Sequence, residues 1–355
     1  MEKVKVGILS VALLAAASGA CGKYESPSQG TEPLDGDGVE YIDLSREEPA
    51  NCYIVSAPGD YKFNAMVKGN GDEALDGIPE SVEILWETFS IEDGENAKDL
   101  VEFLKLEGGY VCFTAEARKG NAIIGVRDGE KKILWSWHIW FTEYPKIQSY
   151  RFNAGSLMDR NLGAISTVGH EALGFLYQWG RKDPFRNSPD IPWRNYGAYP
   201  LSHSGPEEID FAITHPAKFI GASQKPYDWL TPQNGRLWGS VKTIYDPCPP
   251  GYRVPDGGDD GVWKAAGFDT APRKFSDGIF YFGVRGDGSP VRYDAAGFGG
   301  EIYEIPYKRG LEGHYWSCTE KDSLSYCLEF NATDVNPAGT DNRVLANSVR
   351  CFKEH

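Results

Sequence analysis

The stretch Asp246-Pro247-Cys248-Pro249-Pro250-Gly251-Tyr252-Arg253-Val254-Pro255 places one cysteine among four prolines. Proline fixes its own φ and restricts the residue before it, so this segment has a nearly fixed course. A nucleophilic cysteine needs an exposed, electropositive setting, whereas a cysteine in a rigid loop suits a covalent anchor. Its natural partner is Cys351, close to the end of the chain. We therefore predict a C-terminal domain whose last strand is tied to this loop by a Cys248–Cys351 disulfide.

The composition indicates a mostly β protein with more than one domain. A chain of 355 residues suggests two domains, and 41% hydrophobic residues can fill real cores. The 41 glycines and 22 prolines indicate many turns between short strands. A formal net charge of −15 makes nucleic acid and anionic membrane surfaces poor partners.

The N-terminus predicts export. Two lysines precede a short apolar run over residues 6–17, which fits a signal peptide and is too short to span a membrane. Ser18-Gly19-Ala20-Cys21 resembles a bacterial lipobox, although Ser18 stands where leucine is usual, so ordinary secretion remains an alternative. We expect a signal peptide over residues 1–20, a lipid on Cys21 and a flexible tether over residues 21–38.

Six cysteines remain once Cys21 is set aside, and an even number in an exported protein favours disulfides. Six cysteines allow 15 sets of pairings. The alternative is that some are buried thiols, most plausibly those of the first pair. The pairs that we predict are Cys52–Cys112, Cys248–Cys351 and Cys318–Cys327.

Residues 39–145 predict a β-sandwich, because short β-rich runs recur between turn signals. Cys52 and Cys112 lie 60 positions apart, and Tyr110 precedes the second by two. That spacing resembles the inter-sheet disulfide and tyrosine corner of immunoglobulin domains, so we expect an Ig-like sandwich. Trp86 lies too far from Cys52 for the usual core tryptophan. The expected strands cover residues 53–55, 61–63, 82–86, 101–104, 110–113, 122–126 and 133–140.

Three tryptophans in the last of these strands admit two interpretations. Trp135 and Trp137 share one strand face, and Trp140 points to the other. An exposed pair could stack on a sugar ring. We favour the alternative, in which Trp135 and Trp137 fill a core or the junction between domains.

Residues 146–355 have a different character, with shorter strands and a long loop-rich region over residues 183–239. Short helices are expected from Gly169 through residues 172–177 and over residues 260–266. Five blocks of sequence in this half resemble, in the same order, the Fibrobacter succinogenes major paralogous domain, which is widespread in surface lipoproteins of Bacteroidetes. The resemblance covers about residues 148–352. The five blocks lie at residues 158–164, 176–185, 246–255, 315–317 and 348–351.

That family is similar to the C-type-lectin-like fold, which formylglycine-generating enzymes share. The resemblance implies a C-type-lectin-like α+β domain with a small twisted sheet, long loops on one face, and chain ends pinned by a disulfide. A lipobox, an N-terminal sandwich and such a head look like fimbrillin-type or fimbria-associated surface proteins. A fold alone does not give the function.

Motifs for metal binding and catalysis are missing from the sequence. The calcium-binding motifs of sugar-binding lectins, Glu-Pro-Asn or Gln-Pro-Asp with Trp-Asn-Asp, do not occur. His170-Glu171 begins like a zinc protease motif but lacks the second histidine. The six histidines show no pair at metal-ligand spacing. We expect no metal, no cofactor and no catalytic residues.

We therefore expect a non-enzymatic binding module, lipid-anchored in the outer membrane and facing the cell exterior. It would be an adhesin or fimbria-associated protein with a glycan or protein ligand. The alternative for the aromatic residues of the loop region is that they anchor the loops to their own domain. The residues expected to offer a binding surface are Trp193, Tyr196, Tyr199, Trp229 and Trp238.

Two other functions remain open at this point. The first is a structural pilus subunit or anchor, which would contact other fimbrial subunits through its sandwich by strand addition. The second is an enzyme related to the formylglycine-generating group, with Cys318 and Cys327 as redox-active residues.

Overall fold

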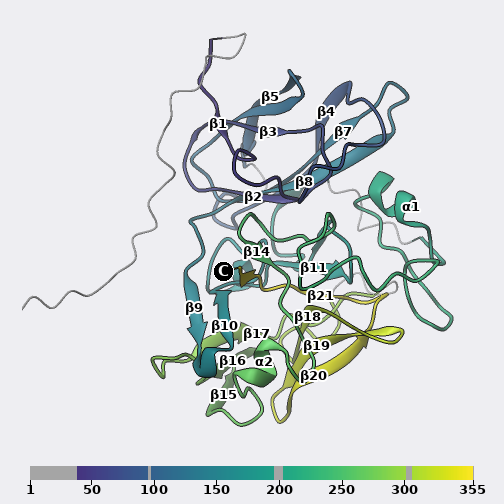
Figure 1. The fold of residues 1–355 in the computed structure, drawn as a ribbon. Coiled ribbons are helices and arrows are strands. Elements are labelled where there is room, and N and C mark those ends of the chain that lie inside the picture. Colours follow the sequence, from purple (N-terminus) through teal and green to yellow (C-terminus); the bar gives the residue numbers. More distant parts are fainter. Residues whose placement is uncertain (1–37, 95–96, 196–202, 301–305, 355) are drawn as a thin grey trace, which may run out of the picture. The chain divides into compact units, whose positions relative to one another are not determined.

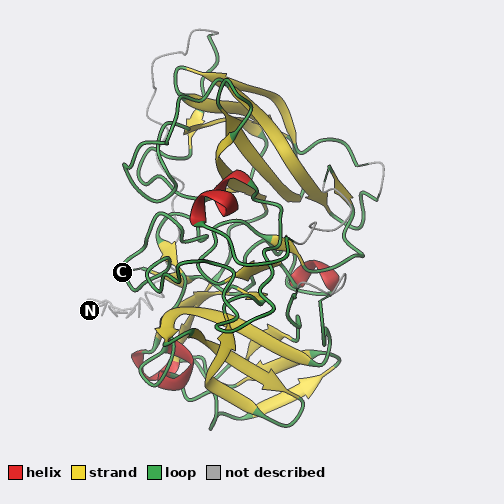
Figure 2. Ribbon diagram, turned by 90° about the vertical axis from the view of Figure 1, so that its right-hand side faces the viewer, coloured by secondary structure: helices red, strands yellow, loops and turns green. Residues whose placement is uncertain are grey.

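The computed structural model describes residues 38–94, 97–195, 203–300 and 306–354. Within it, Tyr41–His355 forms one compact unit. Strand and loop dominate the described residues, with only short helices, among them α1 (Ile209–Thr214) and α2 (Val262–Ala265), as Figure 2 shows. The prediction of a mostly β protein with minor α structure is confirmed. The expected signal peptide, Cys21 and nearly all of the tether lie outside the described residues. In the part that is described, no helix is long and apolar enough to cross a membrane.

Among the described residues, the N-terminal half builds most of two sheets, which we call the N-terminal sheet pair (Figure 1). All seven strands expected from the sequence fall within it. One sheet has the order β1 (Ile42–Asp43), β3 (Gly59–Asn64), β6 (Tyr110–Ala115), β5 (Val101–Glu107). The other has the order β13 (Trp193–Arg194), β4 (Ser81–Phe89), β7 (Gly120–Arg127), β8 (Ile133–Phe141), β2 (Cys52–Val55).

The predicted Cys52–Cys112 disulfide is wrong, because neither side chain enters the core between the two sheets. Side chains alternate along a strand, and Tyr53 on β2 and Val111 on β6 belong to that core. Cys52 therefore points to the opposite side of its sheet, where it packs with residues of the C-terminal half. Cys112 points to the outer side of the other sheet. Both remain buried thiols.

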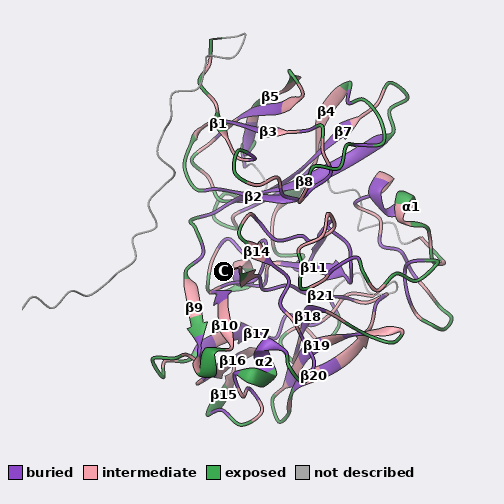
Figure 3. Cartoon of the chain, viewed as in Figure 1, coloured by how far each residue is buried: buried purple, intermediate pink, exposed green. Residues whose placement is uncertain are grey.

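Strand β8 is buried along its whole length, as its purple colour in Figure 3 shows. Trp135 and Trp137 belong to the core of the N-terminal sheet pair, whereas Trp140 belongs to a core shared with the C-terminal half. The core interpretation of these tryptophans is confirmed, because all three are at most 1% exposed. A strand with a core on both faces explains why nearly every residue in it is apolar or hydrogen-bonded.

The junction between the halves is also polar. The Asn51 amide donates to the carbonyl oxygens of Ile244 (2.7 Å) and Asp246 (2.9 Å) and accepts from the indole N–H of Trp135 (2.9 Å). The buried Lys182 ammonium donates to the carbonyl of Ser136 on β8 at 3.0 Å. The shared core and these bonds join the N-terminal sheet pair to the C-terminal half, and the Asn51 bonds reach the proline-rich loop.

His138, also on β8 at this junction, predicts a specific pH dependence of stability. It is 2% exposed, its Nε2 lies 2.8 Å from the Asn121 side-chain oxygen, and its Nδ1 has no hydrogen-bond partner among the described residues. Burial lowers its pKa from 6.5 to about 3. Between these pH values the unfolded chain binds the proton and the folded chain does not, so stability is lost as the pH falls.

The expected result is a free energy of unfolding that falls, relative to the His138→Gln variant, by up to about 1.4 kcal/mol per pH unit between pH 6.5 and 3. The comparison with the variant is needed because burial raises the pKa of Asp246 to about 6, which favours the folded state as the pH falls. Urea unfolding of both proteins across this range measures the difference. Parallel pH profiles would contradict the assignment.

The described residues of the C-terminal half form three further sheets. The largest has the order β12 (Phe185–Arg186), β11 (Phe175–Gln178), β21 (Ala346–Ser348), β18 (Glu312–Lys321), β19 (Leu324–Asn331), β20 (Val335–Asn342). The second has the order β14 (Tyr252–Arg253), β22 (Phe352–Lys353), β10 (Gly155–Met158), β9 (Ile147–Tyr150). The third is β15 (Arg273–Ser276), β16 (Ile279–Phe282), β17 (Val291–Asp294).

One of the two predicted helices is correct. Helix α2 lies within the expected residues 260–266. The helix expected after Gly169 is instead a single 3-10 turn, His170–Ala172, followed by β11. Gly174 ends the turn, because its φ of +65° is not helical and a side chain there would meet the Leu162 carbonyl.

The Cys248–Cys351 disulfide is present, so the central prediction from the sequence is confirmed. Strands β14 and β22 pair next to it, with Arg253 opposite Phe352. The buried Asp246 carboxylate accepts the backbone N–H groups of Cys248 and Val254, both at 2.9 Å. The disulfide, the pairing of β14 with β22 and the hydrogen bonds of Asp246 together fix the proline-rich loop against the last strand.

The predicted Cys318–Cys327 disulfide is wrong. Cys327 on β19 lies opposite Trp316, and a bulge between Trp316 and Glu320 breaks the register around Cys318. Their sulfur atoms have different neighbours. Cys318 Sγ lies 3.4 Å from Asp256 Oδ1, and Cys327 Sγ lies 3.6 Å from Glu329 Oε1. Both are buried thiols.

Candidate functional site

Two of the aromatic residues expected to bind a ligand are instead buried. Trp229 and Trp238 are at most 1% exposed. The Trp229 indole donates to the Trp179 carbonyl at 2.8 Å, and the Trp238 indole donates to the Tyr245 carbonyl at 2.9 Å. For these two, the expectation of a binding surface is wrong and the loop-anchor alternative is correct. A buried indole needs an acceptor for its N–H, and loop carbonyls supply one.

The remaining aromatic candidates do not form a surface in the described residues. Trp193 is 43% exposed and lies on β13, which pairs with β4. The Arg186 guanidinium stacks on its ring at 5.0 Å. Tyr196 and Tyr199 lie outside the described residues.

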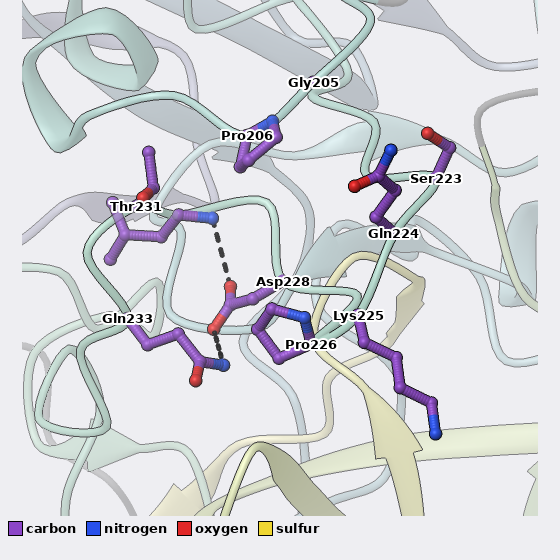
Figure 4. Close-up of a pocket in the computed structure, with 10 residues that line it drawn as sticks. Gly205, Pro206, Ser223, Gln224, Lys225, Pro226, Asp228, Thr231 and Gln233 are labelled. Atoms are coloured by element: carbon purple, nitrogen blue, oxygen red, sulfur yellow. Dashed lines mark hydrogen bonds between the residues drawn. The ribbon is translucent and has the colours of Figure 1, made fainter.

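A pocket of about 340 Å³, lined by both apolar and polar residues, lies in the loop-rich region (Figure 4). Two chain segments form it, around residues 205–206 and 223–233. Its lining residues are Gly205, Pro206, Ser223, Gln224, Lys225, Pro226, Asp228, Leu230, Thr231 and Gln233.

Backbone hydrogen bonds hold the two segments together. The Glu207 N–H donates to the Trp229 carbonyl at 2.9 Å, and the Thr231 N–H donates to the Glu207 carbonyl at 3.0 Å. Because the Trp229 ring is anchored in the core, these bonds fix the pocket walls to the body of the domain. The buried tryptophan thus positions the pocket and does not line it.

Asp228 forms the floor of the pocket and is 3% exposed. One carboxylate oxygen accepts the Leu230 N–H at 3.1 Å and the other accepts the Gln233 amide at 3.0 Å, as the dashed lines in Figure 4 mark. The Arg343 guanidinium lies 3.6 Å from the second oxygen. Burial raises the pKa of Asp228, and the N–H donors and Arg343 oppose that rise. The carboxylate is therefore held in one orientation.

The rim of the pocket carries exposed polar groups. Ser223, Gln224, Lys225 and Thr231 offer hydroxyl, amide and ammonium groups to a ligand. The lining residues include no histidine or cysteine, so the pocket does not contain a cysteine nucleophile paired with a histidine base. The arrangement suits reversible hydrogen bonding to a polar molecule.

The residues of this pocket are not predicted from the sequence. Exposed polar loop residues have no periodic pattern, whereas the aromatic residues beside them are typical of binding surfaces. The run of prolines and polar residues over 223–233 is the signal that could have located it. Comparisons with family models, curated proteins and solved structures gave no match to this chain.

Proposed function

We propose that the protein is a binding module displayed on the outer membrane, lipid-anchored through Cys21, and that its pocket takes a polar ligand of the glycan class. The N-terminal sheet pair would be an Ig-like spacer and the C-terminal half a C-type-lectin-like head. The adhesin or fimbria-associated role follows from this arrangement as an expectation. The export signal and the hydrogen-bonding groups that line the pocket support it.

The observation that carries the proposal is the chemistry of the pocket. A glycan presents hydroxyl groups that both donate and accept hydrogen bonds, and amides, hydroxyls and a carboxylate satisfy both roles. A protein hot spot is typically a desolvated aromatic or arginine-rich patch. The pocket offers proline rings and small polar groups, so a glycan fits its lining better than a protein side chain does.

The properties of the Cys318 and Cys327 thiols do not favour the alternative of a formylglycine-generating-like enzyme. Burial raises the pKa of both Cys318 and Cys327 well above the ordinary thiol value. Catalysis by cysteine requires the thiolate. Neither residue lines the pocket.

The alternative of a structural pilus subunit requires a sheet edge that can pair with an added strand, and β5 does not provide one. This strand ends its sheet, but its pairing with β6 is interrupted between Glu102 and Lys105. Phe103 lies there with φ +48° and is 80% exposed. A bulge of this kind blocks pairing with an added strand.

A glycan array probed with the purified protein tests the proposal. We expect selective binding to a small set of glycans, and at least tenfold less signal from Gln224→Ala, which removes an exposed amide from the rim. Because Gln224 has no buried contact to lose, folding should be unchanged. An array without binding, together with no adhesion to cells, would reject the glycan-binding role.

A further inference from the structure

The successive strands β18, β19 and β20 each contribute one residue to a group of three potential metal ligands (Figure 1). His314 on β18 lies directly opposite Glu329 on β19, and Asp341 lies on β20. Their ligand atoms all lie within 4.8 Å of one another. We call these three residues the His314 cluster. It lies apart from the pocket of Figure 4, with which it shares no residue.

We propose that the His314 cluster binds one divalent transition-metal ion of the Zn²⁺ class. Zinc binds histidine nitrogen and carboxylate oxygen at about 2.0–2.2 Å, so two ligand atoms on one tetrahedral ion lie about 3.3–3.6 Å apart. His314 Nδ1 lies 3.1 Å from Asp341 Oδ2, slightly closer than that separation. The ion would replace the proton between these two atoms, and that proton would leave to solvent.

The surroundings of the cluster resemble those of metal ligands. A metal-bound histidine usually donates its other ring N–H to a carboxylate, and ligand carboxylates are themselves hydrogen-bonded. The second ring nitrogen of His314, Nε2, lies 3.3 Å from Glu312 Oε2. The Asn347 amide donates to Asp341 Oδ2 at 3.1 Å. Both arrangements orient the ligand atoms without a metal.

Two further observations favour a site over a simple ion pair. Asn347 is fully buried, and its amide oxygen has no hydrogen-bond donor among the described residues. Gly339 on β20 leaves the space that the Glu329 carboxyl group occupies, because a Cβ there would lie 2.5 Å from Glu329 Cδ. The strand thus makes room for a half-buried carboxylate beside a second one, an arrangement that a cation stabilises.

The ligand set selects the class of metal. Calcium and magnesium prefer six or more oxygen ligands or several waters, whereas an imidazole with two carboxylates suits zinc and its transition-metal neighbours. Three protein ligands leave at least one position for water.

Zinc titration of chelator-stripped protein, in competition with a chromophoric chelator, tests the proposal. We expect one Zn²⁺ per chain, and affinity at least 100-fold lower in His314→Gln and in Asp341→Asn. Glu312→Gln should weaken binding about 10- to 100-fold, because Glu312 orients the imidazole and does not bind the ion. Gly339→Ala should also weaken binding, because it displaces the Glu329 carboxylate while every ligand remains.

The matched control is His170→Gln. His170 Nδ1 also pairs with one carboxylate, Asp190, at 2.6 Å, but it has no third ligand among the described residues. This variant should bind zinc as the wild type does. Circular dichroism checks each variant for folding, and Glu329→Gln replaces any variant that fails. Absence of saturable zinc binding by the wild type, or equal affinity in the ligand variants, would overturn the proposal and leave an ion-pair network.

Discussion

Replacing Cys248 and Cys351 together by alanine is expected to lower the free energy of unfolding by about 4.7 kcal/mol, the value for a closed loop of about 100 residues. The two residues lie 103 positions apart, so the bond restricts a large part of the unfolded chain. Urea unfolding measures the loss. The slope of free energy against urea should rise as well, because the unfolded chain without the bond exposes more surface.

The matched control for this variant is Cys318→Ala with Cys327→Ala. It also removes two buried sulfur atoms, but these form no disulfide. It should cost less than the first variant and leave the urea slope unchanged. Equal losses in the two double variants would mean that packing, and not the cross-link, accounts for the effect.

Asn51→Ala should be the most damaging single substitution at the junction. It leaves the Trp135 indole N–H and the carbonyl oxygens of Ile244 and Asp246 without their partner. Each buried polar group left unsatisfied costs about 1–3 kcal/mol, so we expect a loss of about 3 kcal/mol or more. Thermal and urea unfolding measure it.

Asn234→Ala is the control, because Asn234 is exposed and its side chain accepts only the nearby Arg236 N–H at 2.9 Å among the bonds described. Its loss should stay below about 1 kcal/mol. We also expect Asn51→Ala to unfold in one transition, since the shared core spans both halves. A variant that melted in two steps, with an unchanged C-terminal transition, would contradict the coupling of the halves through Asn51.

The strands of the N-terminal half could be predicted because their apolar residues recur between clear turns. The sequence did not allow a prediction of which core each face of those strands contacts. Cys52 was expected between the two sheets, but the C-terminal half supplies a second core on the outer side of β2. A strand covered on both faces has no polar side in its sequence to reveal which side chains point inward.

The disulfide of the proline-rich loop could be predicted because the loop's stiffness is local, and Cys248 needs only a partner near the chain end. The pairing of Cys318 with Cys327 failed for the opposite reason. It assumed a regular hairpin, and the bulge between Trp316 and Glu320 has no signature in the sequence.

The two candidate sites were hidden from the sequence for different reasons. The pocket uses small polar loop residues such as Gln224 and Asp228, which look like any solvated loop. The His314 cluster takes one residue from each of three strands, so no ligand spacing appears along the chain. Trp229 is predicted as a ligand contact because it is aromatic and lies in a loop-rich region, but only the fold shows that its ring is buried in the core.

Calorimetric titration of the strongest array glycan tests the central claim, that the pocket is the recognition site, most directly. Lys225→Ala removes an ammonium group from the pocket rim, and Lys274→Ala removes another exposed one on β15, outside the pocket. We predict saturable binding by the wild type and by Lys274→Ala, and at least tenfold weaker binding by Lys225→Ala and by Gln224→Ala. Equal affinity in all four proteins would contradict the assignment of this pocket.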